Sequence, residues 1–306
     1  MTGHGAYTVV AEGLAFPEGP LLLPDGDLAV VEIAGERLTR IGRDGRKHEI
    51  SRLPGGPNGA AIGPDGRIYV CNNGGFAWVR QEGILRPNGP AAGFTGGWIE
   101  RIDPETGKVE RLLSEVEGLP LTGPNDIVFD RHGGFWFTDH GKKHGRTMDL
   151  GAVYYVSDGL ARRVAFPLLG PNGIGLSPGE SELYVAETAT GRLWAYTIVA
   201  PGRLAESNWL SPTGGRLVCG LPGFQRYDSL AVEADGTISI ACLREGGIVS
   251  VRPDGSLVRR VATDDPYTTN LCFGADDLKT AYITLSGTGR LVSMRWPSQG
   301  LRLNFT

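Results

Sequence analysis

One polar position recurs along this chain, each time directly before a short apolar run, and it constrains the fold more than any other feature. Three of its copies read Gly-Pro-Asn, and the others carry Glu, Asp or Asn in the same place. The six residues, called anchor residues below, are Glu18, Asn58, Asn125, Asn172, Asp228 and Asn270. A second apolar run is centred 11 or 12 residues after each anchor. The chain therefore contains six copies of one hairpin unit.

Turn signals and spacing extend each hairpin to a larger repeat. Asp-Gly, a strong hairpin signal, separates the two apolar runs at 25–26, 65–66 and 235–236. The anchors lie 40, 67, 47, 56 and 42 residues apart, which leaves room for two more strands behind most hairpins. Repeats of four strands at this spacing are typical of β-propellers, and 47 glycines in 306 residues agree with many tight turns.

We therefore predict an all-β fold, a six-bladed β-propeller of four-stranded antiparallel blades. The prediction treats residues 1–306 as a single domain. A ring needs its first and last blades joined, and the spare strand at 6–13 is placed to complete the sixth sheet.

The anchors predict a site on the propeller axis. The first strand of each blade lines the axis, so the six anchors should converge at one mouth of the channel, above apolar side chains expected to plug it. Asn is also a common turn residue, but that interpretation does not explain Glu18 and Asp228. Two carboxylates with several amides suit a hard divalent cation such as Ca²⁺. Without His or Cys at the anchors zinc is a weaker choice, while Mn²⁺ or Fe²⁺ would accept such a set.

Two segments are predicted to cover this mouth. The insertion 73–97 carries Phe76 and Trp78, and a loop this long is usually functional, so we expect a lid, with a wandering surface loop as the alternative. The segment "TDHGKKHGRT" should bring Asp139, His140 and His144 to the same face. Phe76, Trp78 and His140 are candidates for substrate contact.

Composition excludes several classes of partner. The net charge is −4, and no Lys/Arg cluster suggests a nucleic-acid or membrane surface. The start of the chain shows no leader-like pattern and no apolar run is long enough to span a membrane, so we expect a cytoplasmic protein. The four cysteines are widely spaced, without a CxxC pair, and are expected to be buried thiols.

Four of the anchors also carry a family resemblance. "FPEGP" around Glu18, "GPNDIVFD" around Asn125, "PNGIGLSP" around Asn172 and "YDSLAVEADG" around Asp228 resemble the gluconolactonase family. That family includes senescence marker protein (regucalcin) and luciferin-regenerating enzyme, and diisopropyl fluorophosphatase has a similar arrangement. The resemblance covers essentially the whole chain.

The resemblance implies a lactonase with one divalent metal, usually calcium, at the top of the channel; Mn, Fe or Zn are alternatives. Glu18, Asn172 and Asp228 would be metal ligands, and Asn125 would be a fourth ligand or a substrate contact. Asp228 is the candidate base that activates water, or the nucleophile. The implied reaction opens a small-molecule lactone or ester at a metal that polarises the carbonyl.

Other functions compete with this one. An ester or organophosphate hydrolase could use the same site, and a non-enzymatic calcium-binding propeller is the alternative from a different class. A strictosidine synthase-like propeller does not use such a metal ring. The sugar-lactone members carry an Arg where this chain has Gly123, which shifts the expected substrate towards a less polar lactone unless Arg80 or Arg226 compensates.

Overall fold

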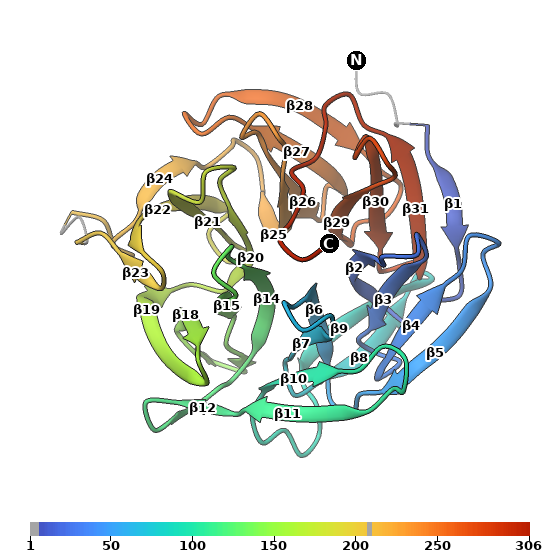
Figure 1. Ribbon diagram of the computed structural model, residues 1–306, viewed down its shortest axis with the longest axis horizontal. Helices are drawn as coiled ribbons and strands as arrows, with labels where there is room; N and C mark the ends of the chain where they lie inside the picture. The colour runs from blue at the N-terminus through green and yellow to red at the C-terminus, as the bar shows by residue number, and fades with distance from the viewer. Residues whose placement is uncertain (1–5, 207–209) are drawn as a thin grey trace.

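Six antiparallel sheets stand around a central axis in the computed structural model, which describes residues 6–206 and 210–306 (Figure 1). The inner strands of neighbouring sheets contact one another all the way round, and the last contacts the first. The predicted six-bladed β-propeller is confirmed. Within the described ranges no helix is long and apolar enough to cross a membrane.

Each blade begins with its inner strand and is built outwards along the chain. The first three blades are β2 (Pro17–Leu22), β3 (Leu28–Glu32), β4 (Arg37–Ile41), β5 (Lys47–Arg52); β6 (Pro57–Ile62), β7 (Ile68–Asn72), β10 (Trp98–Ile102), β11 (Val109–Leu113); and β14 (Pro124–Phe129), β15 (Phe135–Asp139), β18 (Gly151–Ser157), β19 (Leu160–Leu168). The fourth and fifth are β20 (Pro171–Leu176), β21 (Glu182–Glu187), β22 (Arg192–Ala200), β24 (Arg216–Cys219), with the short β23 (Arg203–Leu204) also on β22; and β25 (Arg226–Val232), β26 (Ile238–Leu243), β27 (Gly247–Val251), β28 (Leu257–Ala262).

The sixth blade is completed by the start of the chain. It consists of β29 (Thr268–Gly274), β30 (Thr280–Leu285), β31 (Arg290–Arg295) and β1 (Thr8–Ala11). β1 pairs antiparallel with β31, placing Thr8 opposite Ser293. The N-terminal strand therefore closes the ring, as predicted, as the outer strand of the sixth sheet.

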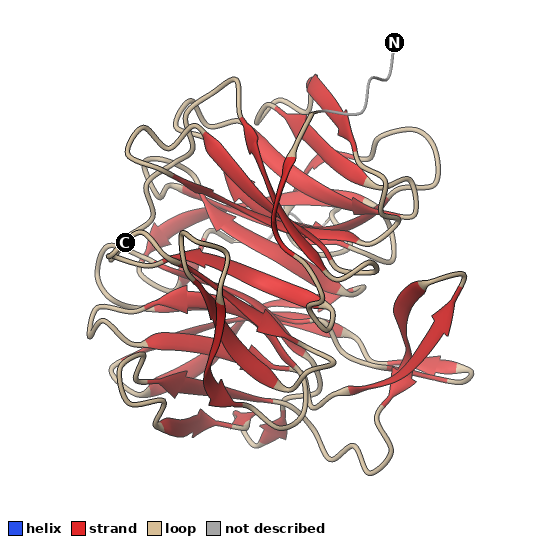
Figure 2. Cartoon of the chain, turned by 90° about the vertical axis from the view of Figure 1, so that its right-hand side faces the viewer, coloured by secondary structure: helices blue, strands red, loops and turns tan. Residues whose placement is uncertain are grey.

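Short two-stranded ribbons extend from the loops that join second and third strands. They are β8 (Phe76–Gln81) with β9 (Ile84–Pro90), and β16 (Lys143–His144) with β17 (Thr147–Met148); a third, β12 (Glu115–Val116) with β13 (Leu119–Pro120), lies between the second and third blades. In side view the C-terminus lies on one face of the propeller and ribbons project from the opposite face (Figure 2).

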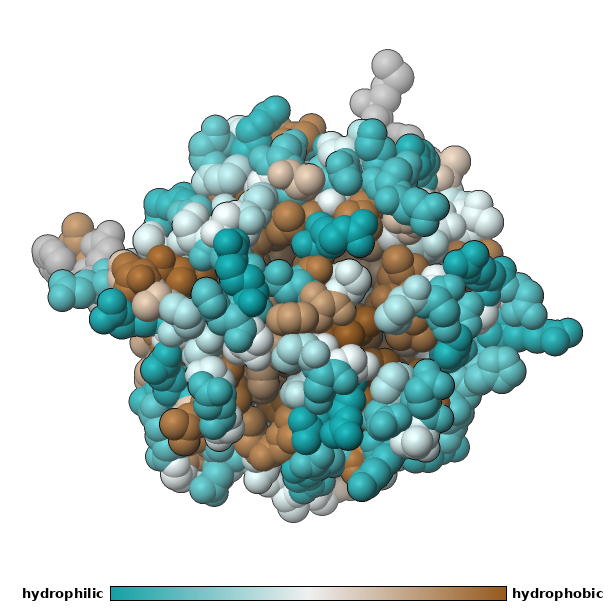
Figure 3. Space-filling model, in the orientation of Figure 1, coloured by the Kyte–Doolittle hydropathy of each residue, from teal (hydrophilic) through white to brown (hydrophobic). Residues whose placement is uncertain are grey.

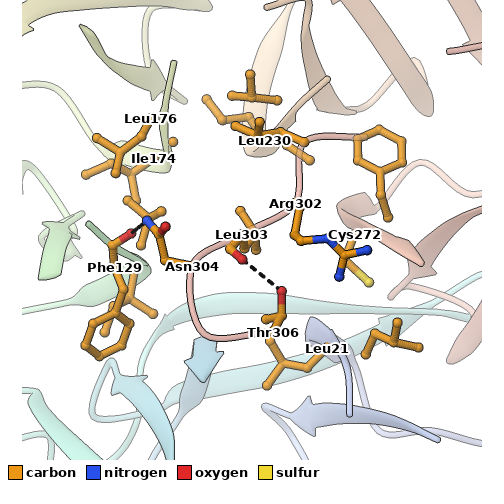
Figure 4. A pocket seen from close by; sticks show the side chains of 18 of the residues that line it. Leu21, Phe129, Ile174, Leu176, Leu230, Cys272, Arg302, Leu303, Asn304 and Thr306 are labelled. Carbon is orange, nitrogen blue, oxygen red and sulfur yellow. Dashed lines mark hydrogen bonds between the residues drawn. The ribbon is translucent and has the colours of Figure 1, made fainter. Parts of the chain in front are cut away.

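The apolar residues of the inner strands surround a cavity, which corrects the predicted plug. The cavity has a volume of about 480 Å³ and lies on the side of the anchors that faces the C-terminus. Leu21, Ile174, Leu176 and Leu230 line it, and the tail 301–306 crosses its mouth (Figure 4). Figure 3 shows apolar side chains gathered around the hollow at the centre of this face.

The difference has a geometric cause. Six inner strands set around one axis stand too far apart for Leu, Ile and Val side chains to meet across it. The tail closes the opening instead: the Asn304 side chain donates hydrogen bonds to Phe129 O (3.0 Å) and Glu180 Oε1 (2.7 Å).

Candidate functional site

A β-bulge occurs near the anchor residue of all six inner strands. In the third blade Pro124 pairs with Asp139 while Ile127 pairs with Phe137, so one extra residue sits on the inner strand between these pairs. The same shift follows Pro17–Glu18, Pro57, Pro171, Tyr227 and Thr268 in the other inner strands. Bulges re-aim side chains and are common beside active sites. Each anchor therefore departs from the regular alternation of its strand.

Hydroxyl groups of the preceding blade hold these irregular strands in place. Thr138 Oγ1 accepts a hydrogen bond from the Asp126 amide (3.1 Å) and donates one to Asn172 O in the next blade (2.6 Å). Thr188 Oγ1 donates in the same way to Tyr227 O (2.6 Å). Backbone groups freed by the bulges thus find partners without water.

All six anchors are buried, with exposed fractions between 3% and 8%. Among them Glu18 and Asn270 are directly joined, because Asn270 Nδ2 donates a 2.7 Å hydrogen bond to Glu18 Oε2. The Gly19 amide donates to the same oxygen (2.8 Å). Asn270, an anchor that the family resemblance does not make a metal ligand, is therefore a partner of the Glu18 carboxylate.

Asp126 is a residue that sequence analysis missed. It is 7% exposed, and its carboxyl group interacts electrostatically with Glu18 and Asp228. Regular alternation predicts that the residue after Asn125 faces away from the axis; the bulge turns Asp126 towards the other two acids instead.

A signal for Asp126 was present in the repeats. The residue after the anchor is glycine in the first, second and fourth blades, where neighbouring inner strands approach closely. A Cβ atom on Gly19 would lie 2.6 Å from Asn58 O, and one on Gly173 would lie 2.6 Å from Leu230 N. An acidic residue in a position that is glycine in three other blades marks the third blade as different.

The three buried acids resist ionisation. Burial raises the pKa of Glu18, and burial together with the Glu18 charge raises the pKa of Asp126 well above its usual range. The pKa of Asp228 is also raised well above its usual range, by burial and then by the charges of Glu18 and Asp126, while a hydrogen bond from Asn172 and the nearby Arg226 oppose the rise. In the parts of the chain that the structure describes, none of the three acids forms an ion pair.

The donor atoms fit a hard divalent cation. The Asn172 Oδ1 atom is buried and accepts no hydrogen bond from any described residue, although buried acceptors are normally paired. A cation would bond this oxygen and neutralise the converging acids. Amide oxygens and carboxylates are both ligands that Ca²⁺ favours. Within the described ranges, no group of three or more Asp, Glu, His or Cys is arranged to hold a metal without other ligands, so amide oxygens would be needed.

The remaining two anchors have different surroundings. Asn125 is 7% exposed, and its side-chain amide forms no hydrogen bond with a described residue. The Asn58 backbone oxygen lies against Gly19, which places this residue between the first and second blades.

The insertion 73–97 forms the β8–β9 hairpin, which lies on the face opposite the C-terminal tail (Figure 2). The Trp78 ring lies 4.9 Å from that of Phe16, two residues before Glu18, and 5.9 Å from that of Phe76. The Leu85 amide donates to Gly287 O in the sixth blade (2.9 Å). The hairpin therefore reaches across to the first and sixth blades, and Phe76 and Trp78 are partly buried in this packing.

Lys142 joins the hairpin to the third blade. Its ammonium group donates to Asn73 Oδ1 (3.0 Å) and Gly75 O (3.1 Å), and lies 3.7 Å from the centre of the Phe76 ring. Burial lowers the pKa of Lys142 to about 7. Sequence analysis did not select this residue, because a lysine in a loop usually faces solvent.

The predicted polar residues of the third blade separate into different environments. His140 is half-buried beside Gly170, and burial lowers its pKa to about 4. Asp139 accepts backbone hydrogen bonds from Thr122, Gly123 and Gly141, so its carboxylate is used in shaping the loop. His144 is exposed and contacts Asp149 (3.3 Å).

Known proteins are similar to this chain in fold and in sequence. The family described as SMP-30/Gluconolactonase/LRE-like region matches residues 16–287. Gluconolactonase of Zymomonas mobilis is 25% identical over 310 residues, covering 91% of this chain and 78% of that protein. Lactonase drp35 of Staphylococcus haemolyticus is 28% identical over 244 residues, covering 78% of this chain and 66% of that protein. The crystal structure of the calcium-binding protein regucalcin from Agrobacterium tumefaciens matches with a TM-score of 0.73 at 20% identity, covering 98% of each chain.

Proposed function

Because the chain belongs to the SMP-30/gluconolactonase/LRE-like family, we propose that it hydrolyses a lactone at the anchor ring, with a divalent cation, Ca²⁺ first among the candidates, bound there. One observation carries the proposal. Three buried acids converge beside an unpaired amide oxygen, and no described cationic side chain forms an ion pair with them. The names of the relatives support lactone hydrolysis as the reaction.

Glu18, Asn172 and Asp228 would hold the cation, and Asn125 would complete the ligand set or contact the lactone. When bound, the cation would stabilise the negative charge that develops on the lactone carbonyl oxygen. Asp126 adds a third negative charge beside the other two acids. Asn270 orients Glu18 through its 2.7 Å hydrogen bond.

Asp228 is the proposed general base. Its carboxylate removes a proton from the attacking water as the water oxygen bonds to the carbonyl carbon. The bond between that carbon and the ring oxygen then breaks, the ring oxygen takes the proton back from Asp228, and the carboxylic acid that forms releases its own proton to solvent. The products are one hydroxyl group and one carboxylate on the same molecule.

The surroundings of the site serve the same reaction. The β8–β9 hairpin, with Phe76 and Trp78, would exclude water from the bound lactone. His140, held neutral at pH 7 by its low pKa, can donate or accept a hydrogen bond beside the site.

The proposal is tested by metal-dependent lactone hydrolysis. Protein stripped with a chelator is assayed on sugar, aliphatic and aromatic lactones, with aryl esters and an organophosphate included, before and after Ca²⁺, Mn²⁺, Fe²⁺ or Zn²⁺ is restored. We expect lactone turnover that needs the metal and falls by about 10²- to 10⁴-fold in Asp228→Asn. Asp254→Asn, at an exposed turn of the same blade, is the matched control. Preference for an ester or organophosphate would reassign the substrate class, and full activity in Asp228→Asn would refute the mechanism.

A further inference from the structure

The residues two positions before the anchors lie where each inner strand begins: four come just before the strand, and Arg226 and Thr268 are the first residues of theirs. They are Phe16, Gly56, Gly123, Gly170, Arg226 and Thr268. Phe16 contacts Trp78 of the hairpin, which places the Phe16 ring beneath the lid. A side chain here would meet the part of a substrate that is remote from the reacting bond.

Most of these positions cannot reach a ligand. A Cβ atom on Gly123 would lie 2.8 Å from Gly141 O, so no side chain fits there. Gly170 is covered by the His140 ring, whose Nε2 would lie 3.0 Å from an added Cβ. Thr268 is buried and donates to Asp265 O (3.0 Å).

Arg226 differs from the other five. Its Nε atom is buried without a hydrogen-bond partner, and in the described parts of the chain its guanidinium forms neither a hydrogen bond nor an ion pair. The positive charge of Arg226 opposes the rise in the pKa of Asp228 and contributes to the low pKa of His140, so the guanidinium group lies near both side chains. Between Arg226 and Asp228, Tyr227 is fully buried, with its hydroxyl 3.4 Å from the Leu221 amide, on the opposite side of the strand.

A buried N–H without an acceptor costs free energy, and a guanidinium cation loses more than a neutral donor. A bound substrate oxygen would remove that cost. We infer that Arg226 is a specificity-determining residue that binds a hydroxyl or carboxylate oxygen of the substrate, away from the reacting bond. This inference rests on the proposed lactone hydrolysis.

The inference changes the expected substrate class. With no side chain possible at Gly123, the sequence favoured a less polar lactone unless another arginine compensates. Arg80, one of the two candidates, is exposed and donates to Gly83 O within its own hairpin (2.7 Å). Arg226 supplies the polar contact from the fifth blade, and a lactone bearing ring hydroxyl groups is the class that it fits.

Two lactones of the same ring size distinguish substrate binding by Arg226 from an effect of Arg226 on catalysis in general. Glucono-1,5-lactone carries hydroxyl groups that δ-valerolactone lacks. In Arg226→Met we expect kcat/KM for glucono-1,5-lactone to fall by about 10- to 100-fold, mainly through KM, because a charged hydrogen bond to substrate is lost. The value for δ-valerolactone should change by less than about threefold, and Arg226→Lys should recover part of the loss.

Arg192→Met, an exposed arginine of the fourth blade, is the matched control. An equal loss on both lactones, or a shifted pH profile with unchanged selectivity, would overturn the inference, because Arg226 would then act only through Asp228.

Binding of a hydroxy acid gives a readout that does not need turnover. We expect gluconate to raise the Tm of metal-loaded protein and to lose this effect in Arg226→Met but not in Arg192→Met. If no lactone is hydrolysed by the parent protein, the proposed function fails, and the gluconate comparison still decides the role of Arg226. Equal stabilisation of parent and Arg226→Met would overturn it.

Discussion

The side-chain amide of Asn270 donates a 2.7 Å hydrogen bond to the carboxylate of Glu18, residues 252 positions apart in the chain. The bond joins the last blade to the first at the level of the anchor ring. It fixes one Glu18 oxygen and so defines the direction of the other. Such outer partners of ligand side chains normally tune the affinity for a metal.

Replacing Asn270 by Leu should weaken the metal site while leaving the propeller folded. We expect the affinity for the activating divalent cation to fall by about 10- to 100-fold, because Glu18 loses the partner that orients it. Calorimetric titration of stripped protein measures the change. Asn58→Ala is the control, since Asn58 donates no described hydrogen bond to a carboxylate; an equal loss in that variant would contradict the specific role of Asn270.

Metal-free protein should lose stability as the pH rises. The raised pKa values of Glu18, Asp126 and Asp228 mean that the folded state binds more protons than the unfolded state, in which carboxyl groups titrate near 4. The unfolding free energy is therefore highest below pH 4 for these groups and falls as the pH rises through their raised values. A saturating divalent cation should remove most of this fall.

Comparison of Asp126→Asn with its parent separates the contribution of the three acids to this pH dependence from that of other titrating groups. The Tm of chelated protein is measured between pH 5 and 8 for this variant and its parent, so that the contributions of His140 and Lys142 cancel. We expect a shallower decline in Asp126→Asn, with weaker cation binding. Identical slopes would show that Asp126 does not share the charge of the ring.

Acid should loosen the β8–β9 hairpin through Lys142. The pKa of this lysine is about 7 when buried, and it returns to about 10.4 when the hairpin opens, so the open form binds more protons. Opening should be up to about thirtyfold more frequent at pH 6 than at pH 8.5. Tryptic cleavage at Arg80, normalised to an unfolded substrate at each pH, measures it.

The pH dependence of this cleavage should disappear in Lys142→Met. The adjacent Lys143 is exposed, so Lys143→Met is the matched control and should behave like the parent. Retained pH dependence in Lys142→Met would assign the effect to another group.

Asn304→Ala should destabilise the tail without affecting the anchor ring. The variant loses hydrogen bonds to Phe129 O and Glu180 Oε1, and we expect the unfolding free energy to fall by about 1–2 kcal/mol. Hydrogen exchange should rise at 300–306, and kcat/KM should stay within about twofold because the tail lies on the opposite face. Thr306→Ala, which removes a bond only to Leu303 O, should have little effect.

Sequence analysis predicted the parts of this molecule that repeat. The hairpin turn signals and the spacing of the anchors predict the six blades. The strand at 6–13 was predicted because the sixth sheet needs a fourth strand. These features depend on local chemistry and on counting strands. They do not depend on how far side chains reach across the axis.

The parts that were missed depend on distances between strands. A β-bulge leaves no mark in the hydrophobic pattern, so the pattern does not show that Asp126 faces the axis. The void beneath the ring depends on the separation of Leu21, Ile174, Leu176 and Leu230, which spacing along the chain does not contain. The burial of Lys142 depends on a hairpin from another blade.

Closure of the ring by β1 and β31 has a consequence for the order of events during synthesis. Glu18 leaves the ribosome 252 residues ahead of Asn270, and β31, the strand that pairs with β1, follows later still. Until then the nascent chain exposes an unpaired sheet edge at each end, a surface prone to pairing with other chains. The closed anchor ring, and any cation that it holds, can therefore form only after the sixth blade has been synthesised.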